Sequence, residues 1–279
     1  MRVALERNWL LATAREEREA TGRTIQYTEP ERWDHPSGCD GWSNRDVIAH
    51  LASTDAIAAA TMAGEALAEV EEYIATLTDG GASTVDGFND FAVKRRADQG
   101  VRAVISEWGR SADGFLAGCA AVPGGEWNDK RVYWIAGQMR VPYLLQSRVM
   151  EWWLHGEDIR AGAELPPRRV HKAIYCVNDL AVRSIPYALS LVGLSFPGKT
   201  VQVTLDGPGE GTWLYGLAPR EVPPSGAAPD TLIEGRGYAF ALIAGHRLSP
   251  EHALEEGSVQ VGGDVALGET VLRNLRAFA

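Results

Sequence analysis

The sequence predicts an α+β protein of two domains, an N-terminal up-and-down four-helix bundle followed by a small α+β domain. The first half of the chain holds long stretches with apolar residues at helical spacing, separated by polar or Gly/Pro-rich connections. The pattern changes after Gly193, where short stretches alternate polar and apolar residues as in half-buried strands. With 279 residues and 45% hydrophobic composition, the chain can form two cores.

Four helices joined by polar connections predict the bundle. We expect them over residues 3–21, 43–77 with a break near Gly64, 84–121, and 141–163. Glycines and prolines predict the loops at 26–41, 79–81 and 123–125. Residues 127–138 are expected to form a short loop or a hairpin that carries exposed aromatic side chains.

The two prolines at 166 and 167 mark the end of the bundle, which places the domains at 1–165 and 166–279. A further helix over 168–192 precedes the strands. The strands are predicted at 199–205, 212–217, 231–234 and 258–261, and further helices at 237–245 and 268–278. Strands with interspersed helices after an all-helical half predict a separate α+β domain.

Composition argues against several classes of partner. A formal net charge of -10 disfavours a nucleic-acid backbone or an anionic membrane surface. No apolar run approaches a membrane span, and the first residues lack the apolar core of a signal peptide. The cysteines, Cys39, Cys119 and Cys176, are odd in number and form no C-x-x-C, so we expect a cytoplasmic protein without a disulfide framework. Cys39 is interpreted as a small buried apolar residue.

Glu151 and His155 stand four residues apart on the predicted helix over 141–163, so they share one face. This helix is apolar on most sides and should be largely buried. A buried carboxylate beside a buried imidazole costs free energy unless each finds a partner. A divalent metal is one such partner. The alternative is that the two side chains hydrogen-bond each other, and the pair by itself favours that interpretation.

His50 adds a third donor. Ser43 and Asp46 form a variant capping box at the start of the second helix, which turns His50 towards the core. Bundles assemble metal sites from such inward side chains on facing helices. His50, Glu151 and His155 are therefore predicted to bind one divalent ion, with zinc preferred. Three protein ligands leave a fourth position open, as in a catalytic zinc site.

Two motifs resemble the mycothiol-dependent maleylpyruvate isomerase family, a branch of the DinB-like metal-binding bundles. They are residues 39–51, CDGWSNRDVIAHL, and residues 151–159, EWWLHGEDI. The family usually has Pro where this chain has Asp40. The resemblance continues at Asn89 within GFND and at residues 263–268, GDVALG, so both halves are covered. It implies a DinB-like bundle and a C-terminal domain similar to sterol-carrier folds.

The resemblance also implies a function. A metal-bound thiolate of a low-molecular-weight thiol, mycothiol, would isomerise a maleylpyruvate-like acid or be transferred to an electrophile. Asp158 belongs to the family pattern and is expected to orient the imidazole of His155. Arg247 stands near the position of a family Gly-Arg pair, displaced by His246, and is the expected catalytic residue that holds a carboxylate. A surface arginine near a helix C-terminus is an equally good interpretation.

The partners implied are a small thiol and a small electrophile, with no nucleic acid and no membrane. The isomerase and the S-transferase stay open, as does the oligomeric state. An alternative from another class is a non-catalytic protein that binds a metal in the bundle and an apolar ligand in the second domain.

Overall fold

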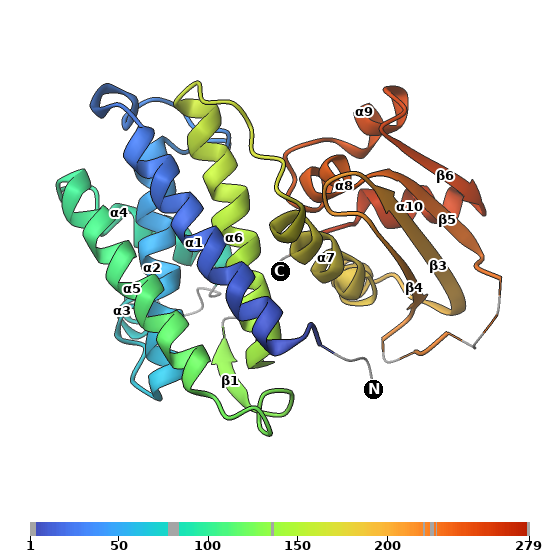
Figure 1. Cartoon of the computed structure of the whole chain (residues 1–279), viewed down its shortest axis with the longest axis horizontal. Helices are drawn as coiled ribbons and strands as arrows, with labels where there is room; N and C mark the ends of the chain where they lie inside the picture. Colours follow the sequence, from blue (N-terminus) through green and yellow to red (C-terminus); the bar gives the residue numbers. More distant parts are fainter. Residues whose placement is uncertain are drawn as a thin grey trace. The chain divides into compact units, whose positions relative to one another are not determined.

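The computed structural model describes residues 4–77, 84–134, 137–219, 221–223, 226 and 228–277. Residue contacts divide the chain into two compact units, Met1–Pro167 and Arg168–Ala279. The first unit is a helical bundle and the second is an α+β domain, as predicted (Figure 1). Within the described residues, no helix is both long and apolar enough to cross a membrane.

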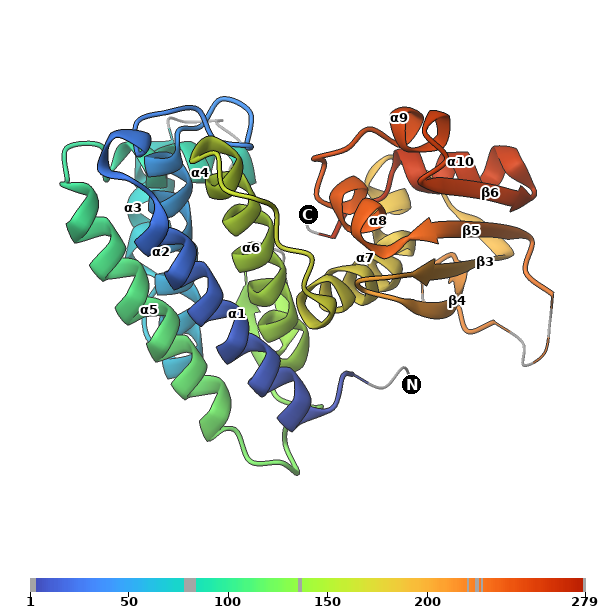
Figure 2. The same cartoon turned by 45° about the horizontal axis from the view of Figure 1, so that its top comes forward.

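Four long helices lie side by side in the first unit, as Figures 1 and 2 show from two directions. They are α1 (Arg7–Tyr27), α2 (Asn44–Ala63), α5 (Val101–Ala121) and α6 (Val141–Gly162). Helix α2 packs against both α5 and α6, and α1 packs against the same two helices. The α2–α6 contact brings the two predicted metal-binding motifs together.

Helix α2 begins and ends where its sequence predicts. The hydroxyl of Ser43 accepts a hydrogen bond from the Asp46 amide, and the Asp46 carboxylate accepts one from the Ser43 amide. Gly64 follows the last turn with φ 73°, a left-handed conformation that favours glycine. The predicted break is confirmed, because α3 (Ala68–Thr76) begins only after it. This capping fixes the rotation of α2 and therefore the direction of His50.

The predicted end of the first helix is wrong. The first helix does not end at residue 21 but continues to Tyr27. Its second half is held by α6, since Thr21 donates to the carbonyl of Trp152 at 3.1 Å. The expected start at residue 3 lies outside the described residues; the helix begins after Glu6, whose carboxylate accepts from the amides of Asn8 and Trp9.

The single helix predicted over 84–121 is also wrong, because the structure has α4 (Val85–Lys94) and then α5. The turn between them carries Arg96, whose buried guanidinium pairs with Glu69 and Glu107. Burying this charge with both partners favours a turn over a continuous helix. The loop or hairpin expected over 127–138 is a hairpin of antiparallel β1 (Arg131–Trp134) and β2 (Gly137–Arg140). Its Tyr133 is exposed as predicted, but Trp127 is buried, so the predicted exposure is wrong for that residue.

The second unit begins with α7 (His171–Leu191) and contains a four-stranded sheet of order β4-β3-β5-β6. Strands β3 and β5 are parallel, and the other neighbours are antiparallel. The strands are β3 (Phe196–Asp206), β4 (Gly211–Leu217), β5 (Thr231–Arg236) and β6 (Val259–Gly263). The remaining helices are α8 (Gly237–Ala244), α9 (Pro250–Glu255) and α10 (Val265–Arg273).

The predicted strands are confirmed with small shifts, whereas α9 was not predicted. It is a helix of six residues that begins after Ser249, whose hydroxyl accepts a hydrogen bond from the His252 amide. The last helix begins earlier than expected because Asp264 caps it, accepting from the Leu267 amide. The helix also ends earlier than the expected residue 278, because it stops at Arg273.

Candidate metal centre

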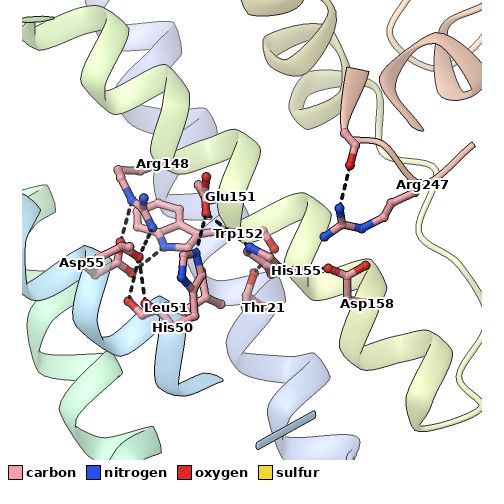
Figure 3. A network of polar contacts seen from close by, with 12 residues as sticks. Thr21, His50, Leu51, Asp55, Arg148, Glu151, Trp152, His155, Asp158 and Arg247 are labelled. Atoms are coloured by element: carbon pink, nitrogen blue, oxygen red, sulfur yellow. Dashed lines mark hydrogen bonds and ion pairs between the residues drawn. The ribbon is translucent and has the colours of Figure 1, made fainter. Parts of the chain in front are cut away.

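Helices α2 and α6 bring together the three predicted ligands in the bundle core (Figure 3). Oε2 of Glu151 lies 3.2 Å from Nε2 of His50 and 3.4 Å from Nε2 of His155. The ligand atoms of all three residues lie within 4.8 Å of one another. The imidazole rings meet edge to face, with centroids 4.9 Å apart.

These separations fit a tetrahedral metal site. Two ligand atoms bound at about 2.0–2.1 Å in tetrahedral geometry are about 3.3 Å apart. Both distances from Glu151 are close to that edge length. The nitrogen and oxygen atoms of a hydrogen-bonded imidazole and carboxylate are usually closer, about 2.8 Å apart. Two imidazoles that converge on one carboxylate oxygen at this spacing therefore fit a divalent ion.

Glu151 is the most exposed of the three predicted ligands. Its side chain is 17% exposed, whereas those of His50 and His155 are 7% and 10% exposed. The ring of Trp42 lies near both imidazoles, with its centroid 5.0 Å from that of His50 and 6.3 Å from that of His155. The contact of Trp42 with both imidazoles was not predicted from the sequence.

Opposite pKa shifts show how the three groups share protons without a metal. Burial favours a raised pKa for Glu151, but hydrogen bonds from His155 and His50 outweigh it and hold the pKa well below its usual value. Burial lowers the pKa of His50. Burial also favours a low pKa for His155, but hydrogen bonds to Asp158 and Glu151 outweigh it and raise the pKa. His155 therefore takes up a proton at a higher pH than His50 does.

Asp158 fixes the tautomer of His155. Its Oδ2 lies 2.9 Å from Nδ1 of that ring, which leaves Nε2 directed at Glu151. The carbonyl of Asp158 accepts from the Gly38 amide at 2.9 Å, so the loop before α2 is attached at the same place. A carboxylate that holds the second nitrogen of a histidine ligand is a common support of zinc sites. The expectation for Asp158 is consistent with this contact.

A buried ion pair lies one helical turn from the centre. Nε of Arg148 is 2.7 Å from Oδ1 of Asp55, and Nε1 of Trp152 donates to Oδ2 of Asp55 at 2.7 Å. This pair was not predicted from the sequence. The available signal was a single acidic residue inside the apolar run that follows His50.

The charges of this region fit a dication. Asp55 is paired with Arg148, whereas the carboxylates of Glu151 and Asp158 both contact the imidazole of His155. A divalent ion bound here would place positive charge beside these two carboxylates. Buried charges are tolerated when they are paired or bind a metal.

Cys39 is not the small buried residue that the sequence predicted. It is half-buried, and its sulfur, a ligand atom of His155 and an oxygen of Asp158 lie within 4.8 Å of one another. The loop that carries it is attached to α6 through Gly38, which explains the approach. This second group of donors shares His155 with the first group, so the imidazole belongs to both.

Arg247 belongs to the second unit, in the turn after α8. Its Nη1 donates to the carbonyl of Gly245 at 2.6 Å, and its amide donates to the carbonyl of Leu242 at 2.8 Å. The side chain is half-buried. Its assignment to the metal centre stays a prediction.

Comparison with known proteins gives relatives for the whole chain. Two uncharacterized proteins of Mycobacterium tuberculosis, MT0041 of strain CDC 1551 / Oshkosh and Rv0036c of strain ATCC 25618 / H37Rv, are each 26% identical to it over 239 residues, 86% of either chain. Crystal structures of the mycothiol-dependent maleylpyruvate isomerase and of a histidine-to-alanine mutant share the fold. Their TM-scores are 0.57 and 0.58 at 17% and 18% identity, over 92% of this chain and 93% of theirs.

A family model covers most of the bundle and both ligand-bearing motifs. It is described as the mycothiol maleylpyruvate isomerase N-terminal domain, and it matches residues 14–160. This range includes His50, Glu151 and His155, and it is more than half of the chain. The chain therefore belongs to the mycothiol maleylpyruvate isomerase N-terminal domain family.

Proposed function

We propose that this protein is a metal-dependent enzyme that activates a low-molecular-weight thiol, mycothiol, for reaction with a small electrophilic acid. The observation that supports it most is the convergence of His50 and His155 on one oxygen of Glu151 at the spacing of metal ligands. The family assignment and the mycothiol-dependent isomerases that share the fold support the choice of thiol.

The proposed ligands are Nε2 of His50, Nε2 of His155 and the carboxylate of Glu151. Zinc is the preferred ion because it takes nitrogen and carboxylate ligands in tetrahedral sites. When bound, a divalent ion supplies Lewis acidity that lowers the pKa of a thiol, so that the thiolate exists near neutral pH. The partly exposed side of Glu151 is where a thiol would reach the centre.

The proposed reaction is either isomerisation or thiol transfer. In isomerisation a thiolate would add to the activated double bond of the acid and leave the negative charge on the conjugated carbonyl. The resulting single bond would rotate, and the thiolate would be expelled as the double bond re-forms. A transferase would stop at the adduct. The bundle contributes a held tautomer of His155, set by Asp158, and a site largely closed to water. Exclusion of water favours the reaction of the thiolate with the acid over side reactions with water.

We further propose that Arg247 binds a carboxylate of the acid. A guanidinium matches a carboxylate with two parallel hydrogen bonds. Arg148 cannot take this role in the same way, because Asp55 and Thr54 already occupy its Nε and Nη2. An acid of this class, met by a chain with a net charge of -10, needs a separate cation.

The test is turnover by metal-loaded protein. The protein is stripped with a chelator, reloaded with zinc, and assayed for mycothiol-dependent conversion of maleylpyruvate and for thiol consumption with an activated alkene. We expect activity in the zinc-loaded protein, loss of activity in His155→Ala, and full activity in His252→Ala, a control at an exposed histidine of α9. Zinc-loaded protein that neither converts the acid nor consumes thiol would support the non-catalytic alternative.

A further inference from the structure

A fully buried polar network lies beside the proposed metal centre (Figure 3). The side chains of Arg148 and Asp55 are 1% and 0% exposed. Both oxygens of Asp55 are used, one by Nε of Arg148 and the other by Nε1 of Trp152, each at 2.7 Å. Nη2 of Arg148 also donates to the hydroxyl of Thr54 at 3.0 Å.

This network joins the two helices that carry the ligands. The hydroxyl of Thr54 donates to the carbonyl of His50 at 3.0 Å, so the network reaches the backbone of the α2 ligand. On α6 its members Arg148 and Trp152 stand on either side of Glu151 in the sequence. The same hydrogen bonds thus hold the backbone of His50 on α2 and residues on both sides of Glu151 on α6.

Stability alone does not explain such a pair. Taking both charges out of water costs several kcal/mol, and a protein with a well-packed apolar pair of similar volume in their place is often as stable. Directional hydrogen bonds fix the rotation and the axial position of one helix against another, which an apolar pair does less strictly. Here the fixed quantity is the distance between the imidazole of His50 and the carboxylate of Glu151, 3.2 Å.

We propose that Asp55 and Arg148 are positioning residues of the metal centre, which hold His50 of α2 in register with Glu151 and His155 of α6. Thr54 links the pair to the backbone of His50, and Trp152, the residue that follows Glu151 on α6, donates a hydrogen bond to Asp55. The guanidinium also lies close enough to offset the charge of Glu151. The inference rests on the proposed metal site, and it adds residues that touch no metal or substrate.

The chain offers a matched control at another buried arginine. Arg96 is also 1% exposed in its side chain and pairs with two carboxylates, those of Glu69 and Glu107. Glu69 lies on α3, Arg96 in the turn after α4, and Glu107 on α5. Among the described residues, their side chains pair with one another and form no hydrogen bond or ion pair with a proposed ligand. Glu69→Gln therefore disturbs a buried ion pair without disturbing the proposed network.

The experiment compares Asp55→Asn with Glu69→Gln in the full chain. Zinc affinity is measured by competition with a chelating dye, and the visible absorption of the Co²⁺-loaded protein reports the ligand geometry. Loss of a residue that supports a metal ligand typically lowers affinity about 10–100-fold. We expect that loss and an altered Co²⁺ spectrum in Asp55→Asn, and wild-type affinity and spectrum in Glu69→Gln.

A folded Asp55→Asn with the affinity and Co²⁺ spectrum of Glu69→Gln would overturn the inference. If Asp55→Asn does not fold, Thr54→Val decides, because it keeps volume and charge and removes only the hydroxyl between Arg148 and His50. Weaker zinc binding with a changed spectrum in that variant supports the proposal, and wild-type behaviour refutes it. Wild-type protein that binds no zinc would instead refute the metal site itself.

Discussion

Oε2 of Glu151 lies 3.2 Å from Nε2 of His50, although the two residues are 101 positions apart in the sequence. The contact depends on two helix starts, because Ser43 sets the rotation of α2 and the β1–β2 hairpin leads directly into α6 at Val141. A metal site at this contact is the hypothesis from which most of the following predictions derive.

Replacement of His50 by alanine should abolish stoichiometric zinc binding while leaving the bundle folded. Only two of the three ligands remain, and the apolar faces of α2 that pack on α5 and α6 are unchanged. Metal content after dialysis and the far-ultraviolet circular dichroism spectrum measure the two effects. A His50→Ala protein that retains one tightly bound zinc would show that this residue is not a ligand.

Asp158→Asn should weaken zinc binding about 10–100-fold, because the carboxylate that holds Nδ1 of His155 is lost. The amide keeps the size of the side chain, so the packing of α6 is preserved. Isothermal titration with zinc gives the affinity. Binding as tight as in the wild type would mean that Asp158 does not support the ligand.

The pH dependence of zinc binding should follow His155. The hydrogen bonds to Asp158 and Glu151 raise its pKa, and the proton must leave before zinc binds. Zinc affinity should therefore fall as the pH drops through a value above the ordinary histidine pKa of about 6.5. The groups that contact this ring from α6 and α2 are Glu151, Asp158 and His50.

The metal-free protein should show the opposite dependence. A raised pKa means that the charged His155 stabilises the fold fully below the unfolded-state pKa, and that this contribution is lost as the pH rises through the folded-state value. Thermal denaturation of metal-free protein between these two pH values measures it. A zinc-free protein whose stability rises through this window would contradict the raised pKa of His155.

Cys39→Ser should leave zinc affinity unchanged. The thiol lies near His155 and Asp158, but the proposed centre has its three ligands from the bundle helices without it. Competition titration of the serine variant against the wild type is the measurement. A large loss of affinity would place the sulfur among the ligands and move the centre towards the loop before α2.

Two neighbouring arginines should differ strongly in their effect on stability. Arg96→Met leaves the carboxylates of Glu69 and Glu107 without their buried partner and should cost about 3 kcal/mol of unfolding free energy. Arg95→Met removes a more exposed pair with Glu72 and should cost less than about 1 kcal/mol. Urea denaturation of both variants gives the comparison. Equal costs would show that the turn between α4 and α5 is not held by its ion pairs.

The sequence predicted the parts of this fold that depend on local patterns. Ser43 and Gly64 mark the ends of α2, and the helix over 141–163 needed little more than its apolar run. The break between α4 and α5 was missed because it depends on Arg96 finding Glu69 on α3, a contact that no local pattern contains. The continuation of α1 past Gly22 was missed for the same reason, since α6 supplies the stabilising contact.

The site residues that could be predicted were likewise those with a local sequence pattern. His50, Glu151 and His155 were predicted because helical spacing gives each a direction, and the resemblance to a family joined the two motifs. Asp55 was not predicted, because its role appears only when α2 and α6 are packed together. Cys39 was misjudged because its position depends on the attachment of a loop to α6 through one backbone hydrogen bond.

The most direct measurement is an anomalous-diffraction crystal structure of the zinc-loaded protein soaked with mycothiol. The proposal predicts one zinc ion bound by His50, Glu151 and His155 at about 2.0–2.2 Å, with the thiol sulfur in the fourth position. A zinc ion bound elsewhere, or a bundle in which His50 and Glu151 keep their direct hydrogen bond and no ion is present, would contradict it.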